Sequence, residues 1–120
     1  MKIEIRKVNE IEIAEVFSDN IIIKETQDAL DLMANISYQG SNKIIIYEKN
    51  IIPDFFDLKT KIAGEILQKF STYNVYLAII GDFSKYSGKS LKDFIFESNK
   101  IGRINFVNSK EEAIHRLSRN

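Results

Sequence analysis

Cysteine and tryptophan are missing from this 120-residue chain, and histidine and proline occur only once each. Without cysteine the protein can form no disulfide framework, no thiolate metal site and no cysteine nucleophile. The single histidine, His115, leaves no histidine-rich metal site. We therefore expect neither a metal ion nor another cofactor.

Long apolar runs and an excess of charge are also missing. The longest apolar stretches, such as Ile44–Tyr47, span only a few residues, whereas a membrane span needs about 20. The first residues alternate apolar and charged side chains, unlike a signal peptide. Lys and Arg total 17, as do Asp and Glu, so the net charge is zero. We expect a cytoplasmic protein with no membrane partner and no nucleic-acid partner, because non-specific nucleic-acid binders are usually basic.

The hydrophobic pattern predicts strands that alternate with helices. Residues 2–8 and 11–17 alternate apolar and polar side chains, as half-buried strands do, and Asn9-Glu10 is short enough to join them as a hairpin. Three further apolar runs predict buried strands, at residues 43–48, 75–80 and 104–107. The strands therefore form a hairpin followed by three strands of the kind found in parallel sheets.

Apolar residues at helical spacing predict four helices between and after these strands. Thr26 is the expected N-cap of the first helix, and the second runs from Pro53 to Ser71, with Gly64 explained by a close helix–sheet contact. Ser87 and Ser90 are candidate caps of the third helix, and Ser109 caps the fourth. Residues 1–120 should thus form a single α/β domain of order β-β-α-β-α-β-α-β-α, with a mostly parallel five-stranded sheet.

Residues 81–90, Gly-Asp-Phe-Ser-Lys-Tyr-Ser-Gly-Lys-Ser, follow a predicted buried strand and lead into a helix. Ligands of open α/β sheets bind at this edge. Six residues separate Gly81 from Gly88-Lys89, whereas a P-loop has four, so nucleotide hydrolysis is disfavoured. Ser87, Lys89 and Ser90 could still hold an anion at a helix N-terminus, although a simple capping role for the serines is favoured.

The two halves of the chain differ in charge. Residues 1–60 hold 7 basic and 11 acidic side chains, a balance of −4, and residues 61–120 hold 10 and 6, a balance of +4. The basic excess could form a patch for an acidic partner, or it could be an ordinary solvated helix face, which is favoured. His115 should be exposed, and no paired carboxylates point to acid–base catalysis. The sequence thus favours a non-catalytic role, with an enzyme of unknown class as a weaker alternative.

Aromatic side chains that fall outside the core pattern predict an interaction surface. Phe83, Tyr86 and Phe96 do not lie on the apolar helix faces, and of the adjacent pair Phe55 and Phe56 one should face outward. Clustered exposed aromatics mark interfaces. The candidate partner-binding residues, which include the two acids beside that pair, are Asp54, Phe55, Phe56, Asp57, Phe83 and Tyr86.

Three stretches of the chain resemble a known family: residues 29–33, residues 54–70 and residues 79–94. They read ALDLM, then DFFDL through AGEILQKF, then IIGDFSKY through SLKDF. Together they resemble the bacterial family called domain of unknown function 4180, and the resemblance covers nearly the whole chain. It implies no established activity.

More distantly, the order and size of the elements are similar to the STAS domain of anti-sigma-factor antagonists. That resemblance implies a module that binds a partner kinase and is switched by phosphorylation of a serine after the third strand. Residues 53–60 read PDFFDLKT and contain no serine, so this switch has no counterpart here. We expect a STAS-like protein-binding module whose partner is another protein, with a homodimer left open. The alternative is a sensor of a phosphate-bearing small molecule at residues 81–90.

Overall fold

The first two strands form an antiparallel hairpin, as their alternating pattern predicts. In a computed structural model, which describes residues 1–119, β1 (Lys2–Val8) pairs with β2 (Ile11–Phe17) along its full length. Asn9 and Glu10 both adopt positive φ, 52° and 66°, as a two-residue hairpin turn requires. The turn is therefore formed without the glycine that usually occupies its second position.

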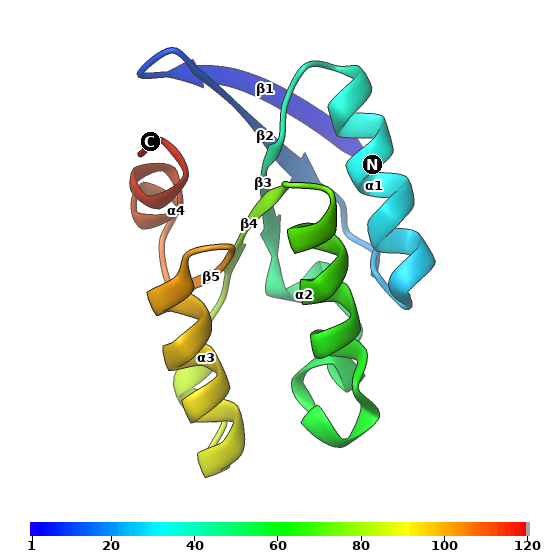
Figure 1. The fold of residues 1–120 in the computed structure, drawn as a ribbon, viewed down its shortest axis with the longest axis vertical. Coiled ribbons are helices and arrows are strands. Elements are labelled where there is room, and N and C mark those ends of the chain that lie inside the picture. The colour runs from blue at the N-terminus through cyan, green and yellow to red at the C-terminus, as the bar shows by residue number, and fades with distance from the viewer. Residues whose placement is uncertain (120) are drawn as a thin grey trace.

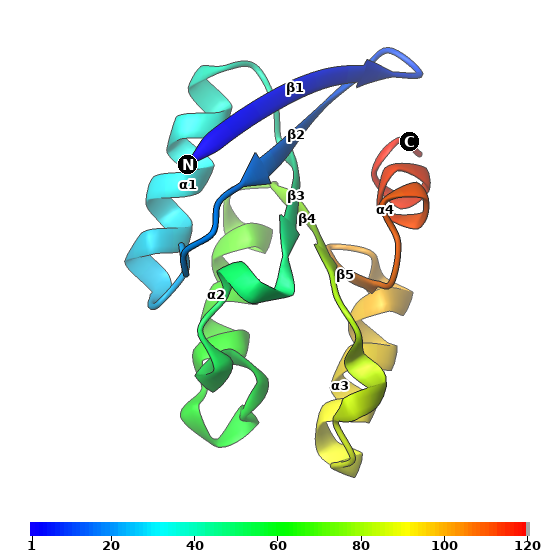
Figure 2. The same cartoon turned by 180° about the vertical axis from the view of Figure 1, so that it is seen from behind.

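Three parallel strands continue the sheet from β2, and the strand order follows the chain: β1-β2-β3-β4-β5. These strands are β3 (Lys43–Tyr47), β4 (Tyr76–Ile80) and β5 (Ile104–Val107). The predicted α/β class, the element order and the five-stranded sheet are confirmed. Figures 1 and 2 show β1 as the outermost strand on one side of the sheet and β5 on the other.

The two faces of the sheet are covered unequally. Three helices lie on one face, and α4 (Lys110–Leu117) lies on the other, against β4 and β5 (Figure 1). The three are α1 (Thr26–Tyr38), α2 (Ile62–Thr72) and α3 (Lys89–Ile101). Consecutive parallel strands with right-handed crossovers place their connecting helices on the same face, which explains this division. No helix within residues 1–119 has the length and apolar character needed to cross a membrane.

Helix boundaries differ from the predicted ones in two places. The N-cap of α1 is Glu25, not Thr26, because the Asp28 carboxylate accepts hydrogen bonds from the backbone N–H groups of Lys24 and Glu25 at 2.9 and 3.2 Å. The helix expected from Pro53 is divided into two 3₁₀ turns, residues 53–56 and 58–60, and α2 begins only after Lys61, whose φ is +68°. A residue with left-handed backbone cannot continue a right-handed helix.

Two local expectations about the helices can be compared with the structure directly. Ser109 caps α4 as predicted, since its hydroxyl accepts a hydrogen bond from the Glu112 backbone N–H at 3.1 Å. Gly64 is not explained by a close contact: a Cβ built there meets no atom within 4 Å. Gly64 lies on the exposed side of α2, so space does not demand glycine at this position.

A buried carboxylate on β2 links α4 to a strand that is two or more positions away from β4 and β5, on which α4 packs. Glu15 of β2 is fully buried, and its oxygens receive Arg6 at 2.7 Å, Lys110 at 3.0 Å and the Tyr47 hydroxyl at 2.8 Å. Burying a carboxylate is costly unless opposite charges and hydrogen-bond donors surround it. These three partners meet that need, and Lys110 thereby fastens the first turn of α4 to the sheet.

Candidate functional site

The carboxyl ends of β3, β4 and β5 meet at one edge of the sheet, and the loops that leave this edge form the candidate site. Glu48 directly follows β3 and Gly81 directly follows β4. Because the strand order never reverses, the sheet offers no topological switch point of the kind that opens a ligand crevice in doubly wound folds. The shape of this edge therefore depends on its loops.

Glu48 joins two of these loops. Its carboxylate oxygen Oε2 accepts a hydrogen bond from the Tyr86 hydroxyl at 2.6 Å and lies 2.8 Å from the Lys85 ammonium. Burial, together with the bond to Glu48, holds the pKa of Tyr86 well above its usual value near 10. The phenol therefore keeps its proton and remains a donor to the carboxylate throughout the physiological pH range.

Gly81 makes this arrangement sterically feasible. A Cβ at this position would lie 2.5 Å from Glu48 Oε1 and 2.7 Å from Glu48 Cβ, closer than non-bonded carbon and oxygen atoms can approach. Residue 81 must lack a side chain because Glu48 packs directly on its backbone. Glycine is thus required here by a close approach between two strand ends.

An aromatic cluster lies beneath the same loops. The rings of Phe56 and Tyr86 are stacked at 5.2 Å, Phe83 lies 5.9 Å from Phe56, and Phe55 meets Phe56 edge-on at 5.0 Å. Phe106 of β5 contacts Phe83 edge-on at 5.3 Å. Centroid separations of this size are typical of stabilising aromatic pairs.

The expectation that Phe55 or Phe56 faces outward is wrong. Phe55 is 1% exposed and Phe56 is 6% exposed. That expectation assumed one continuous helix, in which neighbouring side chains diverge by about 100°. The 3₁₀ turn at residues 53–56 instead lies across the end of the core, where Phe55 contacts Phe106 and Phe56 contacts Phe83 and Tyr86. Phe96, by contrast, is exposed as expected.

Two hollows flank the Phe56–Tyr86 stack. One, of about 710 Å³, lies between residues 56–59 and residues 85–91. The other, of about 410 Å³, lies between residues 48–53 and residues 85–86. Phe56, Lys85 and Tyr86 line both hollows and form the wall between them. Both volumes fall in the range of small-molecule sites, roughly 300–1,000 Å³.

The residues predicted to bind an anion are only partly brought together. Ser87 and Ser90 line the larger hollow, but the Lys89 ammonium bonds to Asp93 at 2.8 Å and is not among the lining residues. The serines do not cap α3, because the N-cap is Gly88 and no side chain bonds to the helix N-terminus. The basic side chains that do line the hollow are Lys59 and Lys85.

The two predicted acidic residues are exposed, but Asp54 lines neither hollow. Asp57 lines the larger hollow, and its carboxylate accepts a hydrogen bond from the Lys59 backbone N–H at 3.2 Å. The Thr60 hydroxyl bonds to the backbone oxygens of both Asp54 and Asp57 at 2.8 Å. These bonds hold the loop in place, so the position of Lys59 beside the hollow is fixed by its neighbours.

Sequence reasoning missed Glu48 and Lys59. The signal for Glu48 was its position as the first charged residue after an apolar strand, where carboxyl-edge sites are found. Lys59 gave no such signal, because residues 53–71 were read as one helix. Within residues 1–119, no group of three or more His, Cys, Asp or Glu side chains is arranged to hold a metal ion.

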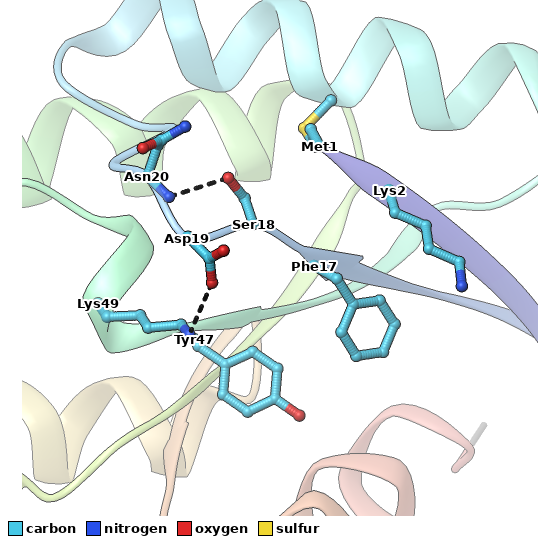
Figure 3. A pocket seen from close by; sticks show the side chains of 8 residues that line it. All are labelled: Met1, Lys2, Phe17, Ser18, Asp19, Asn20, Tyr47 and Lys49. Carbon is cyan, nitrogen blue, oxygen red and sulfur yellow. Dashed lines mark hydrogen bonds and ion pairs between the residues drawn. The ribbon is translucent and has the colours of Figure 1, made fainter.

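A further hollow, of about 580 Å³, opens on the sheet face at the ends of β1, β2 and β3 (Figure 3). Phe17 and Tyr47 line it, and Lys2 and Lys49 lie to its sides. Both ammonium groups already face carboxylates: Lys2 pairs with Glu4 at 3.0 Å and Lys49 with Asp19 at 3.9 Å. The carboxyl-edge hollows are therefore the stronger candidate, because Lys59 is in no ion pair with another residue in the described part of the chain.

A model of the family described as domain of unknown function 4180 matches residues 8–117. The match spans most of the chain, so the protein belongs to this family. No curated protein and no solved structure matches the chain.

Proposed function

We propose that this member of the family is a STAS-like regulatory module that binds another protein at the carboxyl edge of its sheet and performs no catalysis itself. The observation that carries the proposal is the pair of hollows that meet at the Phe56–Tyr86 wall. Apolar Leu58 and Leu91 line the larger hollow together with Lys59 and Lys85. Protein interfaces have this composition, an apolar and aromatic centre with charged groups at the rim.

The expected contact places an apolar side chain of the partner in the larger hollow and an acidic side chain beside Lys59. The Lys59 side chain is available for this contact, whereas the Lys85 ammonium is held by Glu48. Phe55 supports the surface from below, because its burial prevents direct contact with a partner, and Phe56, 6% exposed, presents only a small part of its ring to the hollows. The contact residues of the proposed site are therefore Asp57, Leu58, Lys59, Tyr86 and Ser87.

Affinity capture with matched variants tests this proposal. Lys59→Glu reverses the rim charge, and Ser87→Trp fills the larger hollow; both residues are exposed, so both variants should fold. Lys100→Glu and Ser71→Trp make the same chemical changes at exposed positions that do not line the hollow. The tagged wild-type chain and both controls should enrich the same host protein in near-stoichiometric amount, and the two site variants should lose it. Equal enrichment by all five proteins would refute this surface.

A second candidate function is the binding of a phosphate-bearing small molecule in the same hollow. The N-terminus of α3 opens toward Ser87 and Ser90 without a side-chain cap, and Lys59 and Lys85 lie on the hollow's other side. Free helix amides and lysines favour phosphate.

Inorganic pyrophosphate is a suitable probe of this second function, with thermal unfolding as the readout. It should raise the melting temperature of the wild-type chain and of Lys89→Ala, because Lys89 bonds to Asp93 instead. Lys59→Ala should lose the shift. A shift that disappears only in Lys89→Ala would contradict the geometry, and the absence of any shift would leave protein binding as the favoured function.

A further inference from the structure

The two edge strands of the sheet differ in whether other groups bond to their outward-facing backbone. At β5, the side-chain amide of Asn99 bonds to both backbone groups of Phe106: it accepts from the N–H at 2.6 Å and donates to the oxygen at 3.1 Å. The Ser98 hydroxyl donates to the Ile104 oxygen at 2.5 Å. Side chains of α3 thus take the place of a sixth strand, and this edge is closed to another chain.

The β1 edge has no such cover. Among residues 1–119, no hydrogen bond reaches the backbone of Lys2–Val8 from outside the β1–β2 ladder. The strand contains no proline, and its pairing with β2 runs without a bulge from Lys2 opposite Phe17 to Val8 opposite Ile11. Proline, bulges and short length are the usual means of blocking an edge strand, and β1 uses none of them.

Charged side chains are the other means of preventing an edge strand from pairing with another chain, and those on β1 are of mixed sign. Lys2, Glu4 and Arg6 lie on one face, and Ile3 and Ile5 lie on the other. In an antiparallel pair of identical strands centred on Ile5, each Glu4 lies opposite Arg6 of the other copy, which gives two Glu4–Arg6 pairs. Each of the seven residues of β1 then lies opposite a residue of the other strand. If the pair is centred on Glu4, Glu4 faces itself and Lys2 faces Arg6, so like charges meet and disfavour the pairing.

We propose that β1 pairs antiparallel with β1 of a second copy of this chain, centred on Ile5, to give a two-fold symmetric dimer with one continuous ten-stranded sheet. The pairing is isologous, as most homodimer interfaces are. The Arg6 side chain is 34% exposed and so is accessible to the second copy, while its guanidinium also bonds to Glu15. The Glu4 carboxylate of the second copy would lie beside that guanidinium.

Sedimentation velocity over a range of concentrations tests the dimer. The wild-type chain should sediment as a dimer, and Glu4→Lys should raise the dissociation constant at least about tenfold, because two attractive cross-strand pairs become repulsive. Glu97→Lys makes the same change at an exposed position on α3 and should leave the dimer intact. A wild-type chain that is monomeric at all concentrations, or a dimer that Glu4→Lys does not weaken, would overturn the proposal.

The register is tested by single cysteines, for which this cysteine-free chain gives a clean background. In Ile5→Cys the two thiols face each other across the symmetry axis, so mild oxidation should cross-link most of the protein. In Ile3→Cys the thiols are separated by four residues, about 13 Å along the strand, which is beyond disulfide reach. Cross-linking of Ile3→Cys in preference to Ile5→Cys would refute this register. If Ile5→Cys does not fold, the Glu4→Lys result still decides the proposal.

Discussion

Gly81→Ala should destabilise the protein even though it adds only one methyl group. The new Cβ would lie 2.5 Å from Glu48 Oε1, 2.7 Å from Glu48 Cβ and 3.1 Å from Phe83 Cζ. Glu48 would have to move, and its hydrogen bond from Tyr86 would lengthen or break. Overpacking of this kind costs about 1–3 kcal/mol, and loss of a hydrogen bond to a charged group costs about 1.5–3 kcal/mol when both partners are shielded from water. Because the site is partly exposed, we expect a total of about 2–4 kcal/mol.

Urea unfolding in two backgrounds separates this clash from other effects. Glu48→Gly removes both of the Glu48 atoms that the new methyl would meet. In that background, only the 3.1 Å contact with Phe83 remains, so Gly81→Ala should cost much less and the coupling free energy between the two positions should be about 2 kcal/mol. Gly64→Ala is the matched control: its Cβ meets no atom within 4 Å, and it should stabilise α2 by about 1 kcal/mol. An equal cost of Gly81→Ala in both backgrounds would refute the reasoning.

Three further predictions concern the hairpin and the buried carboxylate. Glu15→Gln should reduce the unfolding free energy by about 1–3 kcal/mol, because Arg6 and Lys110 lose a charged hydrogen-bond partner but are one-third exposed and stay partly hydrated. Glu12→Gln on the same strand should leave it nearly unchanged, and equal effects in urea unfolding would contradict this. Burial and the bond to Glu15 raise the pKa of Tyr47 to about 12, so between pH 10 and 12 the unfolded chain loses this proton first and stability should fall as the pH rises. Tyr47→Phe should make the fall in stability shallower, with Tyr86 accounting for part of what remains, and an unchanged profile would argue against this explanation. Glu10→Gly should raise the unfolding free energy by about 1 kcal/mol, since glycine adopts the φ of 66° without strain, and a loss of stability would refute that explanation.

The strands could be predicted from the sequence because each is defined by its own local pattern. Alternation marked the hairpin at residues 2–17, and apolar runs marked the three parallel strands, all within a residue or two of the observed bounds. Helix ends were predicted less well, since they depend on which side chain accepts a hydrogen bond from each free backbone N–H group. Asp28 takes the N–H of Glu25, so the helix is capped one residue before Thr26.

The candidate site was only partly predictable, because it is made by contacts between distant segments. The carboxyl edge was expected to carry it, but the Glu48–Tyr86 bond joins residues that are 38 positions apart, and no local pattern indicates it. The left-handed backbone at Lys61 likewise has no signature in its own side chain, yet it ends the 3₁₀ turns that place Lys59 beside the hollow.

The strand order has a consequence for how the chain acquires its structure. Each strand pairs with the strand that precedes it in the chain, so the hairpin closes a two-residue turn, each parallel pairing closes a single helical crossover, and none has to wait for a more distant segment. During synthesis the sheet can therefore grow from its first hairpin as successive segments emerge. The ion pair between Lys110 and Glu15 is the exception, since it joins the last helix to the second strand. Until that helix is made, Glu15 lacks one of its two cations, so docking of the last helix completes the neutralisation of a charge placed near the start of the chain.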